Sequence, residues 1–207
     1  MDWNLETLNV AQRHRLLAGL VIPRPIALVT TIENGVVNAA PFSFFNIIGT
    51  EPPTLVISIG HREPDQGLKD TARNINASGE FVVHLVDEAM TERMHGCSLP
   101  FPKEISEVVR VGFSTVKARC VSPPLIVEAP VAMECRLHSR VEVGNHDLFI
   151  GQIIWVHTRD GLVDPNTLQV QMQEYQIVGR LCGNRYVRTQ DWFSINENAF
   201  LTTAKGP

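Results

Sequence analysis

The 207-residue sequence lacks an unbroken apolar run long enough to span a membrane. Its most apolar early stretch, residues 16–29, is interrupted by Pro23 and Pro25, whereas a spanning helix needs about 18 or more continuous apolar residues. The N-terminus carries Asp2 and Glu6 where a secretory signal peptide would carry positive charge. We therefore expect a cytoplasmic protein that does not act at a membrane.

Positive charge and cysteine pairs are also scarce. The chain has 18 Lys and Arg against 22 Asp and Glu, a net charge of −4, which argues against a nucleic-acid-binding protein. Its four cysteines include no C-x-x-C pair, so we expect free thiols in a reducing compartment. His84, His95 and Cys97 are close in sequence, but a metal site would need further suitably spaced ligands. We expect no bound metal.

Common catalytic motifs are missing as well. The sequence contains no G-x-S-x-G nucleophile motif, no G-x-x-x-x-G-K-S/T phosphate loop and no H-E-x-x-H zinc motif. It also contains no G-x-G-x-x-G, which makes a Rossmann dinucleotide site an unfavoured interpretation. Any chemistry must therefore come from a less familiar arrangement of residues.

Strand patterns dominate what is present. Asn34-Gly35 follows a β-branched run and predicts a hairpin turn. Helix patterns are short, and the clearest ends at Gly79. Strands are expected at 26–32, 54–59, 80–86, 131–143, 148–157 and 175–178, and helices at 5–17, 66–78, 87–94 and 103–109. The short connections favour an antiparallel barrel or sandwich over a doubly wound sheet.

Two stretches have the composition of a ligand site. Residues 38–46 combine small side chains, hydroxyl and amide groups and three phenylalanines, which suits a planar heteroaromatic ligand. The alternative is a strand and an aromatic-rich turn that pack the core. Residues 69–74 place Lys69, Thr71, Arg73 and Asn74 near a helix N-terminus, a combination that suits a phosphate. Here the alternative is a solvated helix face.

Read together, these stretches resemble the flavin reductase-like family of FMN-binding split-barrel proteins. The resemblance covers roughly residues 20–190 and rests on an ordered set of short pieces rather than on one decisive motif. The matching pieces are residues 24–31, 35–46, 51–53, 58, 69–71, 73–75, 79–83, 134–135, 144–146, 148–151, 180–183 and 186.

The resemblance implies a mainly β fold, a six-stranded antiparallel split β-barrel with Greek-key order and short flanking helices. It implies residues 20–190 as the flavin-binding domain, preceded by a helical extension at 1–19 and followed by a tail at 191–207. It further implies a homodimer that binds FMN non-covalently near the subunit interface. NADH or NADPH would donate hydride to the flavin, and a monooxygenase or another redox protein would be a partner.

The resemblance also assigns positions to the cofactor. The residues expected along the flavin ring and ribityl chain are Thr30, Thr31, Asn38, Ala39, Ala40, Ser43 and Asn46. Those expected towards the phosphate are Ser58, Lys69, Thr71 and Arg73, while Arg180 and Gly183 lie in a late segment that reaches the cofactor in relatives.

His146 is the candidate catalytic residue. Relatives often carry Gly-Asp-His, and in some of them the histidine lies near the flavin or the nicotinamide. This sequence reads Gly144-Asn145-His146-Asp147, so the acid before the histidine is missing, and Asp147 is the candidate for a partial substitute. A structural role for a histidine at a strand turn is the alternative.

Three functions fit this sequence. The first is an NAD(P)H-dependent flavin reductase with bound FMN, in which hydride passes from nicotinamide to flavin. The second is an FMN-bound electron-transfer protein, flavoredoxin-like, that a partner protein reduces. The third is a split-barrel binding protein that has lost its flavin or holds another ligand, such as a haem or pyridoxal phosphate.

Overall fold

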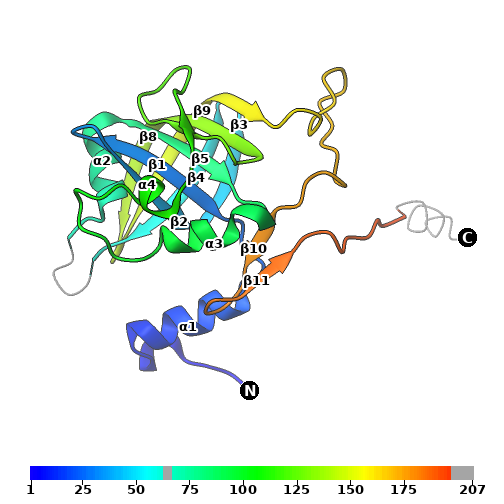
Figure 1. Cartoon of the computed structure of the whole chain (residues 1–207). Helices are drawn as coiled ribbons and strands as arrows, with labels where there is room; N and C mark the ends of the chain where they lie inside the picture. The colour runs from blue at the N-terminus through cyan, green and yellow to red at the C-terminus, as the bar shows by residue number, and fades with distance from the viewer. Residues whose placement is uncertain (63–66, 197–207) are drawn as a thin grey trace, which may run out of the picture.

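The computed structural model describes residues 1–62 and 67–196, and its centre is one antiparallel sheet of seven strands (Figure 1). The strands follow the order β2 (Val36–Phe42), β1 (Ala27–Glu33), β5 (Glu80–Leu85), β8 (Val131–Val143), β9 (His146–Thr158), β4 (Pro53–Gly60) and β3 (Phe45–Thr50). The mainly β antiparallel prediction is confirmed. The strand count differs from the expected six because residues 36–50 add two edge strands, β2 and β3, and the strand expected at 175–178 is not part of this sheet.

The sheet curls because its two edge strands are consecutive in the chain. β2 ends at Phe42 and β3 begins at Phe45, so only Ser43 and Phe44 connect the two edges. Three residue steps span at most about 11 Å, so these strand ends lie close together. The Ser58 N–H of β4 donates to the Phe44 carbonyl at 2.8 Å and fixes this link. Ser43 and Phe44 therefore sit where the barrel is split.

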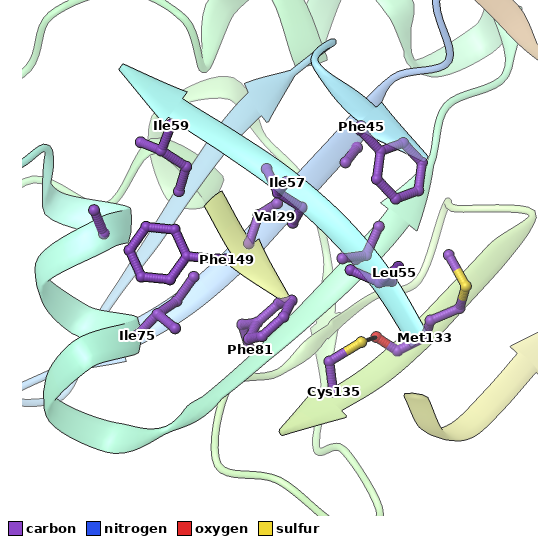
Figure 2. Close-up of a cluster of buried hydrophobic side chains, with 13 residues drawn as sticks. Val29, Phe45, Leu55, Ile57, Ile59, Ile75, Phe81, Met133, Cys135 and Phe149 are labelled. Carbon is purple, nitrogen blue, oxygen red and sulfur yellow. Dashed lines mark hydrogen bonds between the residues drawn. The ribbon is translucent and has the colours of Figure 1, made fainter. Parts of the chain in front are cut away.

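The barrel interior is filled by apolar side chains from the strands (Figure 2). Val29, Leu55, Ile57, Phe81 and Phe149 are fully buried within this cluster. Each such side chain contributes about 1.5–3 kcal/mol when it leaves water.

A glycine makes room for one of these rings. A Cβ atom added at Gly151 on β9 would lie 2.4 Å from Cζ of Phe81. No unstrained contact is that short, so β9 approaches the Phe81 ring closely only because residue 151 has no side chain.

Short helices cover the outside of the barrel and one of its ends. The helix α2 (Asp70–Ser78) packs Ile75 into the interior cluster, and η2 (Glu88–Met90), α3 (Thr91–Gly96) and α4 (Glu107–Val111) form a second apolar cluster over Leu28. Gly79 ends α2 in the left-handed conformation, at φ 70°, as predicted. The expected start of this helix, Gln66, lies outside the described residues, and 67–69 are not helical.

The N-terminal helix lies outside the barrel, beside a small sheet. The expected helix 5–17 is instead a short 3₁₀ turn, η1 (Leu5–Thr7), and α1 (Val10–Leu20). Asn9 and Gln12 form a reciprocal capping box that starts α1 later than expected. In Figure 1, α1 lies next to β10 (Val178–Arg180) and β11 (Tyr186–Arg188). The strand expected at 175–178 is therefore correct only at Val178.

Residues 113–128 form a strap across the outer face of the barrel and contain β6 (Thr115–Val116) and β7 (Leu125–Ile126). Thr30 Oγ1 donates to the Pro124 carbonyl at 2.8 Å, and the Ile126 N–H donates to Nε2 of His84 at 2.9 Å. The fully buried Glu134 accepts from two further backbone N–H groups of the strap. Burial lowers the pKa of His84 to about 4, so this histidine is a neutral acceptor at pH 7.

Within the part of the chain that the structure describes, no helix is both long and apolar enough to cross a membrane. The four cysteines are free thiols, as expected.

Candidate functional site

Two clefts meet at the split of the barrel. The first, the β2 cleft, has a volume of about 1040 Å³ and lies between residues 38 and 40–42 of β2, the start of α2 and the loop 97–101. The second, the basic cleft, has a volume of about 710 Å³ and lies between α1, the Ser43-Phe44 link and residues 180–184. Pro41, Phe42, His61 and Lys69 line both, so the two clefts are neighbours. Their sizes match those of small-molecule sites.

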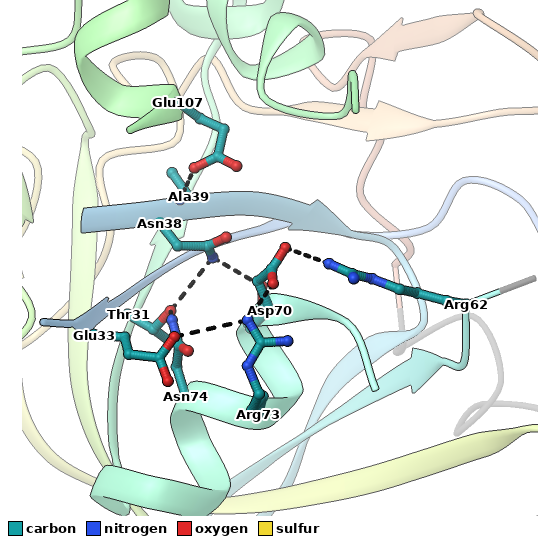
Figure 3. A network of polar contacts seen from close by, with 10 residues as sticks. Thr31, Glu33, Asn38, Ala39, Arg62, Asp70, Arg73, Asn74 and Glu107 are labelled. Atoms are coloured by element: carbon teal, nitrogen blue, oxygen red, sulfur yellow. Dashed lines mark hydrogen bonds and ion pairs between the residues drawn. The ribbon is translucent and has the colours of Figure 1, made fainter. Parts of the chain in front are cut away.

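A polar network lies behind the β2 cleft (Figure 3). The Asn38 amide donates to Oγ1 of Thr31 at 3.3 Å and to Oγ1 of Thr71 at 3.0 Å. The Asn74 amide also donates to Thr31, at 3.0 Å, and its own carbonyl oxygen is buried without a hydrogen-bond partner among the described residues. This network joins β1, β2 and α2, so it holds the wall of the cleft in place.

The N-terminus of α2 opens at the junction of the two clefts. Lys69 is the N-cap residue and its side chain makes no capping hydrogen bond, so the first-turn N–H groups receive no bond from it. Burial, followed by the nearby charge of Arg62, lowers the pKa of Lys69. A solvent-accessible cation beside a helix N-terminus is a suitable place for an anion such as phosphate.

Arg73 is not part of this arrangement. Its guanidinium pairs with Asp70 and lies 3.7 Å from a carboxylate oxygen of Glu33, in a small cavity that borders the β2 cleft at Asn38, Asp70 and Glu107 (Figure 3). These acids raise the pKa of Arg73, chiefly through the Asp70 hydrogen bond. The charge of Arg73, which the sequence places near Lys69, is therefore balanced by Asp70 and Glu33.

His146 lies in the basic cleft, between Ser58 and Phe44. Its Nδ1 is 2.9 Å from Oγ of Ser58, and its ring stacks on Phe44 at a centroid distance of 5.8 Å. Burial is the largest cause that lowers its pKa, followed by the charges of Lys69, His14 and His61, while Asp147 raises it. His146 is therefore neutral at pH 7 and offers one ring N–H and one acceptor nitrogen.

Asp147 does not hold His146 by a hydrogen bond, contrary to the substitution that the sequence suggests. It is fully buried and bonds both Arg140, at 2.9 and 3.0 Å, and Nε2 of His61, at 3.1 Å. His61 lines both clefts, so the acid orients a second histidine that sequence reasoning did not select.

Most of the predicted site residues come together, on two neighbouring surfaces. Asn38, Ala40, Lys69 and Thr71 line the β2 cleft. Ser43, Ser58, Lys69, His146, Arg180 and Gly183 line the basic cleft, although more than 100 residues separate the first from the last.

Besides Arg73, four predicted residues do not line either cleft. Thr30 faces the strap, and Thr31 lies behind Asn38 as its hydrogen-bond acceptor. Ala39 packs its side chain into the second apolar cluster, the one over Leu28, while its N–H donates to Glu107 at 3.0 Å. Asn46 is exposed on the edge strand β3, where its side chain accepts from the Ile47 N–H.

The structure adds cleft residues that were not assigned to the cofactor from the sequence. His14 comes from α1, Arg24 precedes β1, and Phe44 forms an aromatic contact with both His14 and His146. Within the described residues, no group of three or more His, Cys, Asp or Glu side chains has the spacing of a metal site.

Comparison with known proteins places this geometry in a family. The flavin reductase like domain matches residues 18–179. A 2-nitrobenzoate 2-nitroreductase from Pseudomonas fluorescens is 37% identical, with 95% of each chain covered and a TM-score of 0.87. Nitrilotriacetate monooxygenase component B from Bacillus cereus is 29% identical, covering 94% of this chain and 98% of that one, with a TM-score of 0.90.

A more distant structure agrees in fold. A protein with a split barrel domain from Shewanella frigidimarina is 19% identical, covers 95% of this chain and 98% of its own, and has a TM-score of 0.81. The fold is thus a split barrel, and the match over residues 18–179 shows that the chain belongs to the flavin reductase-like family.

Proposed function

We propose that this protein binds FMN and acts as an NAD(P)H-dependent oxidoreductase of the flavin reductase type. The observation that carries the proposal is the pair of neighbouring clefts with Lys69 and the N-terminus of α2 between them. The volume of each cleft, about 710 and 1040 Å³, is sufficient for one small-molecule ligand. The family and its FMN-binding structural relatives support flavin as the first of these ligands.

The residues of the β2 cleft fit FMN. Ala40 is small, so a ring can approach the β2 backbone closely, and the Asn38 amide is already oriented by two threonines. Lys69, Thr71 and the helix N-terminus would hold a single phosphate. When bound, FMN would supply the hydride chemistry, and the protein supplies binding and orientation.

The basic cleft would receive the second ligand. The Phe44 ring lines it and could stack on a planar ligand, and neutral His146 offers a ring nitrogen for a hydrogen bond without adding a charge. Because hydride transfer needs no protein nucleophile, His146 would orient a ligand rather than attack one.

The relatives support two kinds of electron acceptor. One structural relative is named as a nitroreductase and another as a monooxygenase component. The reducing equivalents of this protein would accordingly pass either to a small aromatic acceptor or to a partner monooxygenase. An electron-transfer protein that a partner reduces, rather than NADH or NADPH, is the competing function.

We also propose a homodimer, with residues 20–190 as its flavin-binding unit. Only Ala18 of α1 is buried, and Leu17, Leu20 and Val21 expose apolar surface beside the basic cleft. The apolar residues Trp192 and Phe193 of the C-terminal segment are exposed as well. A second copy would cover these side chains.

A visible absorption spectrum of the purified protein tests the proposal. Flavin bands should be present, and heat release followed by chromatography should yield FMN as the main species. Anaerobic addition of NADH or NADPH should bleach the bands. Bleaching only by a reduced partner protein would support the electron carrier, and a colourless protein that fails to bind added FMN would contradict flavin binding altogether.

A further inference from the structure

The lining of the basic cleft differs in charge from the rest of the chain. The protein carries a net charge of −4, yet Arg15, Arg24, Lys69 and Arg180 line this cleft together with three histidines, and no Asp or Glu lines it among the described residues. A cleft with one sign of charge attracts ligands of the opposite sign.

Two of these cations are held directly opposite each other. Arg24 and Arg180 form an antiparallel bridge, with backbone hydrogen bonds of 3.0 and 2.8 Å. Like charges at such positions destabilise the pair. Neither guanidinium forms an ion pair with a carboxylate of the described chain. The repulsion is therefore not relieved within this part of the protein.

Arg24 has a structural use for its donors. It donates to Ser43 Oγ at 3.2 Å, to the carbonyls of Val21 and Leu181 at 2.8 and 3.1 Å, and to the Ala18 carbonyl. These neutral acceptors satisfy the N–H donors of Arg24 but do not neutralise its positive charge.

Arg180 is held in place by Tyr186, but most of its N–H donors make no hydrogen bond among the described residues. One of its terminal nitrogens donates to the Tyr186 hydroxyl, and its guanidinium lies 4.8 Å from the centroid of the Tyr186 ring. The same hydroxyl lies 2.8 Å from Nδ1 of His95 on α3, so Tyr186 is itself held. Among the described residues Arg180 makes no other side-chain hydrogen bond. Its remaining donors can bind an oxyanion in a bidentate manner.

We propose that Arg180, positioned by Tyr186, binds the anionic group of the second substrate in the basic cleft. That substrate is a planar compound with a carboxylate or phosphate group, placed next to Phe44. The inference deepens the function proposed above and rests on it. The anion has two sources, the phosphates of a nicotinamide dinucleotide or the carboxylate of an aromatic acceptor, and both use the same guanidinium chemistry.

Calorimetric titration of the FMN-loaded protein tests this without any turnover. The probes are 4-nitrobenzoate, its neutral counterpart 4-nitrobenzamide, and inorganic pyrophosphate. The variant is Arg180→Gln, and the matched control is Arg185→Gln, an exposed arginine of the same segment that does not line the cleft. Arg180→Gln should weaken the binding of at least one anion by roughly ten- to a hundredfold, leave the amide unchanged, and exceed any effect of the control.

The probes distinguish the two sources. Loss of nitrobenzoate binding alone assigns the site to an aromatic acceptor, and loss of pyrophosphate binding alone assigns it to the dinucleotide. Unchanged anion affinities, or an equal loss for the amide, would overturn the proposal. If Arg180→Gln does not fold, Tyr186→Phe keeps both the charge and the ring and should weaken the same anion several-fold.

The outcome is separable from that of the proposed function. Anion binding is measured without a hydride donor, so a protein that binds anions through Arg180 but is not bleached by NADH or NADPH refutes only the reductase activity.

Discussion

Replacement of Lys69 by alanine provides a direct test of where the FMN phosphate lies. The side chain makes no capping hydrogen bond, so its loss leaves the start of α2 intact, and burial already disfavours its charge in the free protein. A charge-assisted hydrogen bond is worth about 1.5–3 kcal/mol. At about 1.4 kcal/mol for each tenfold change, Lys69→Ala should weaken FMN binding roughly ten- to a hundredfold.

Two further variants calibrate this result. Thr71→Ala removes an uncharged donor to the phosphate and the acceptor of the Asn38 amide, so it should also weaken FMN binding, but without a change in the salt dependence. Arg73→Ala is the control, because Arg73 is the cation within the same helix and its side chain lines neither cleft, being paired with Asp70 and Glu33. It should leave FMN affinity nearly unchanged.

The assay is titration of the FMN-free protein with FMN, followed by flavin fluorescence at two salt concentrations. Added salt should weaken binding to the parent protein more than to Lys69→Ala, because salt screens the phosphate contact that the variant lacks. If Lys69→Ala binds FMN as tightly as the parent, the phosphate lies elsewhere, and Arg24 and Arg180 become the next candidates.

The fold and the assembly give three more predictions. The pKa of His84 is about 4 in the folded protein and 6.5 ordinarily, so the unfolded chain binds the proton more readily and stability falls as pH drops from 6.5 towards 4, by about 3 kcal/mol in total. Urea unfolding at pH 7.5 and 4.5 measures this, and His84→Gln should flatten the difference. Gly151→Ala should cost about 1–3 kcal/mol in thermal unfolding, since the new methyl meets Phe81, whereas Gly19→Ala in the exposed helix α1 should be stabilising. Light scattering should report about twice 23.1 kDa, and a monomer that retains flavin would contradict the dimer.

The parts of the fold that depend on residues close together in the sequence could be predicted from it. Asn34 and Gly35 form the expected turn with positive φ values of 51° and 81°, and β8 spans the predicted 131–143. Edge strand β3 was not predicted, because its exposed apolar residues Ile47 and Ile48 do not follow the alternation of a half-buried strand.

The parts of the site that depend on distant contacts could not be predicted. Thr30 and Thr31 are adjacent, yet they face opposite sides, and only the contact with Pro124 shows which side the strap covers. In the same way, the spacing of Lys69 and Arg73 suggests one cationic helix face. The ion pair of Arg73 with Glu33, a residue of the distant strand β1, directs the Arg73 side chain away from the clefts.

The bonds of Arg24 have a consequence for the order in which the protein is made. Its guanidinium joins the end of α1 to the Leu181 carbonyl, across 157 residues of sequence. On the ribosome, the last strand of the main sheet emerges before residue 181 does. A nascent chain can thus pair all seven strands of its barrel while the basic cleft still lacks the side that residues 180–184 form. Ligand capture in that cleft becomes available late in translation, after the interior is already closed to water.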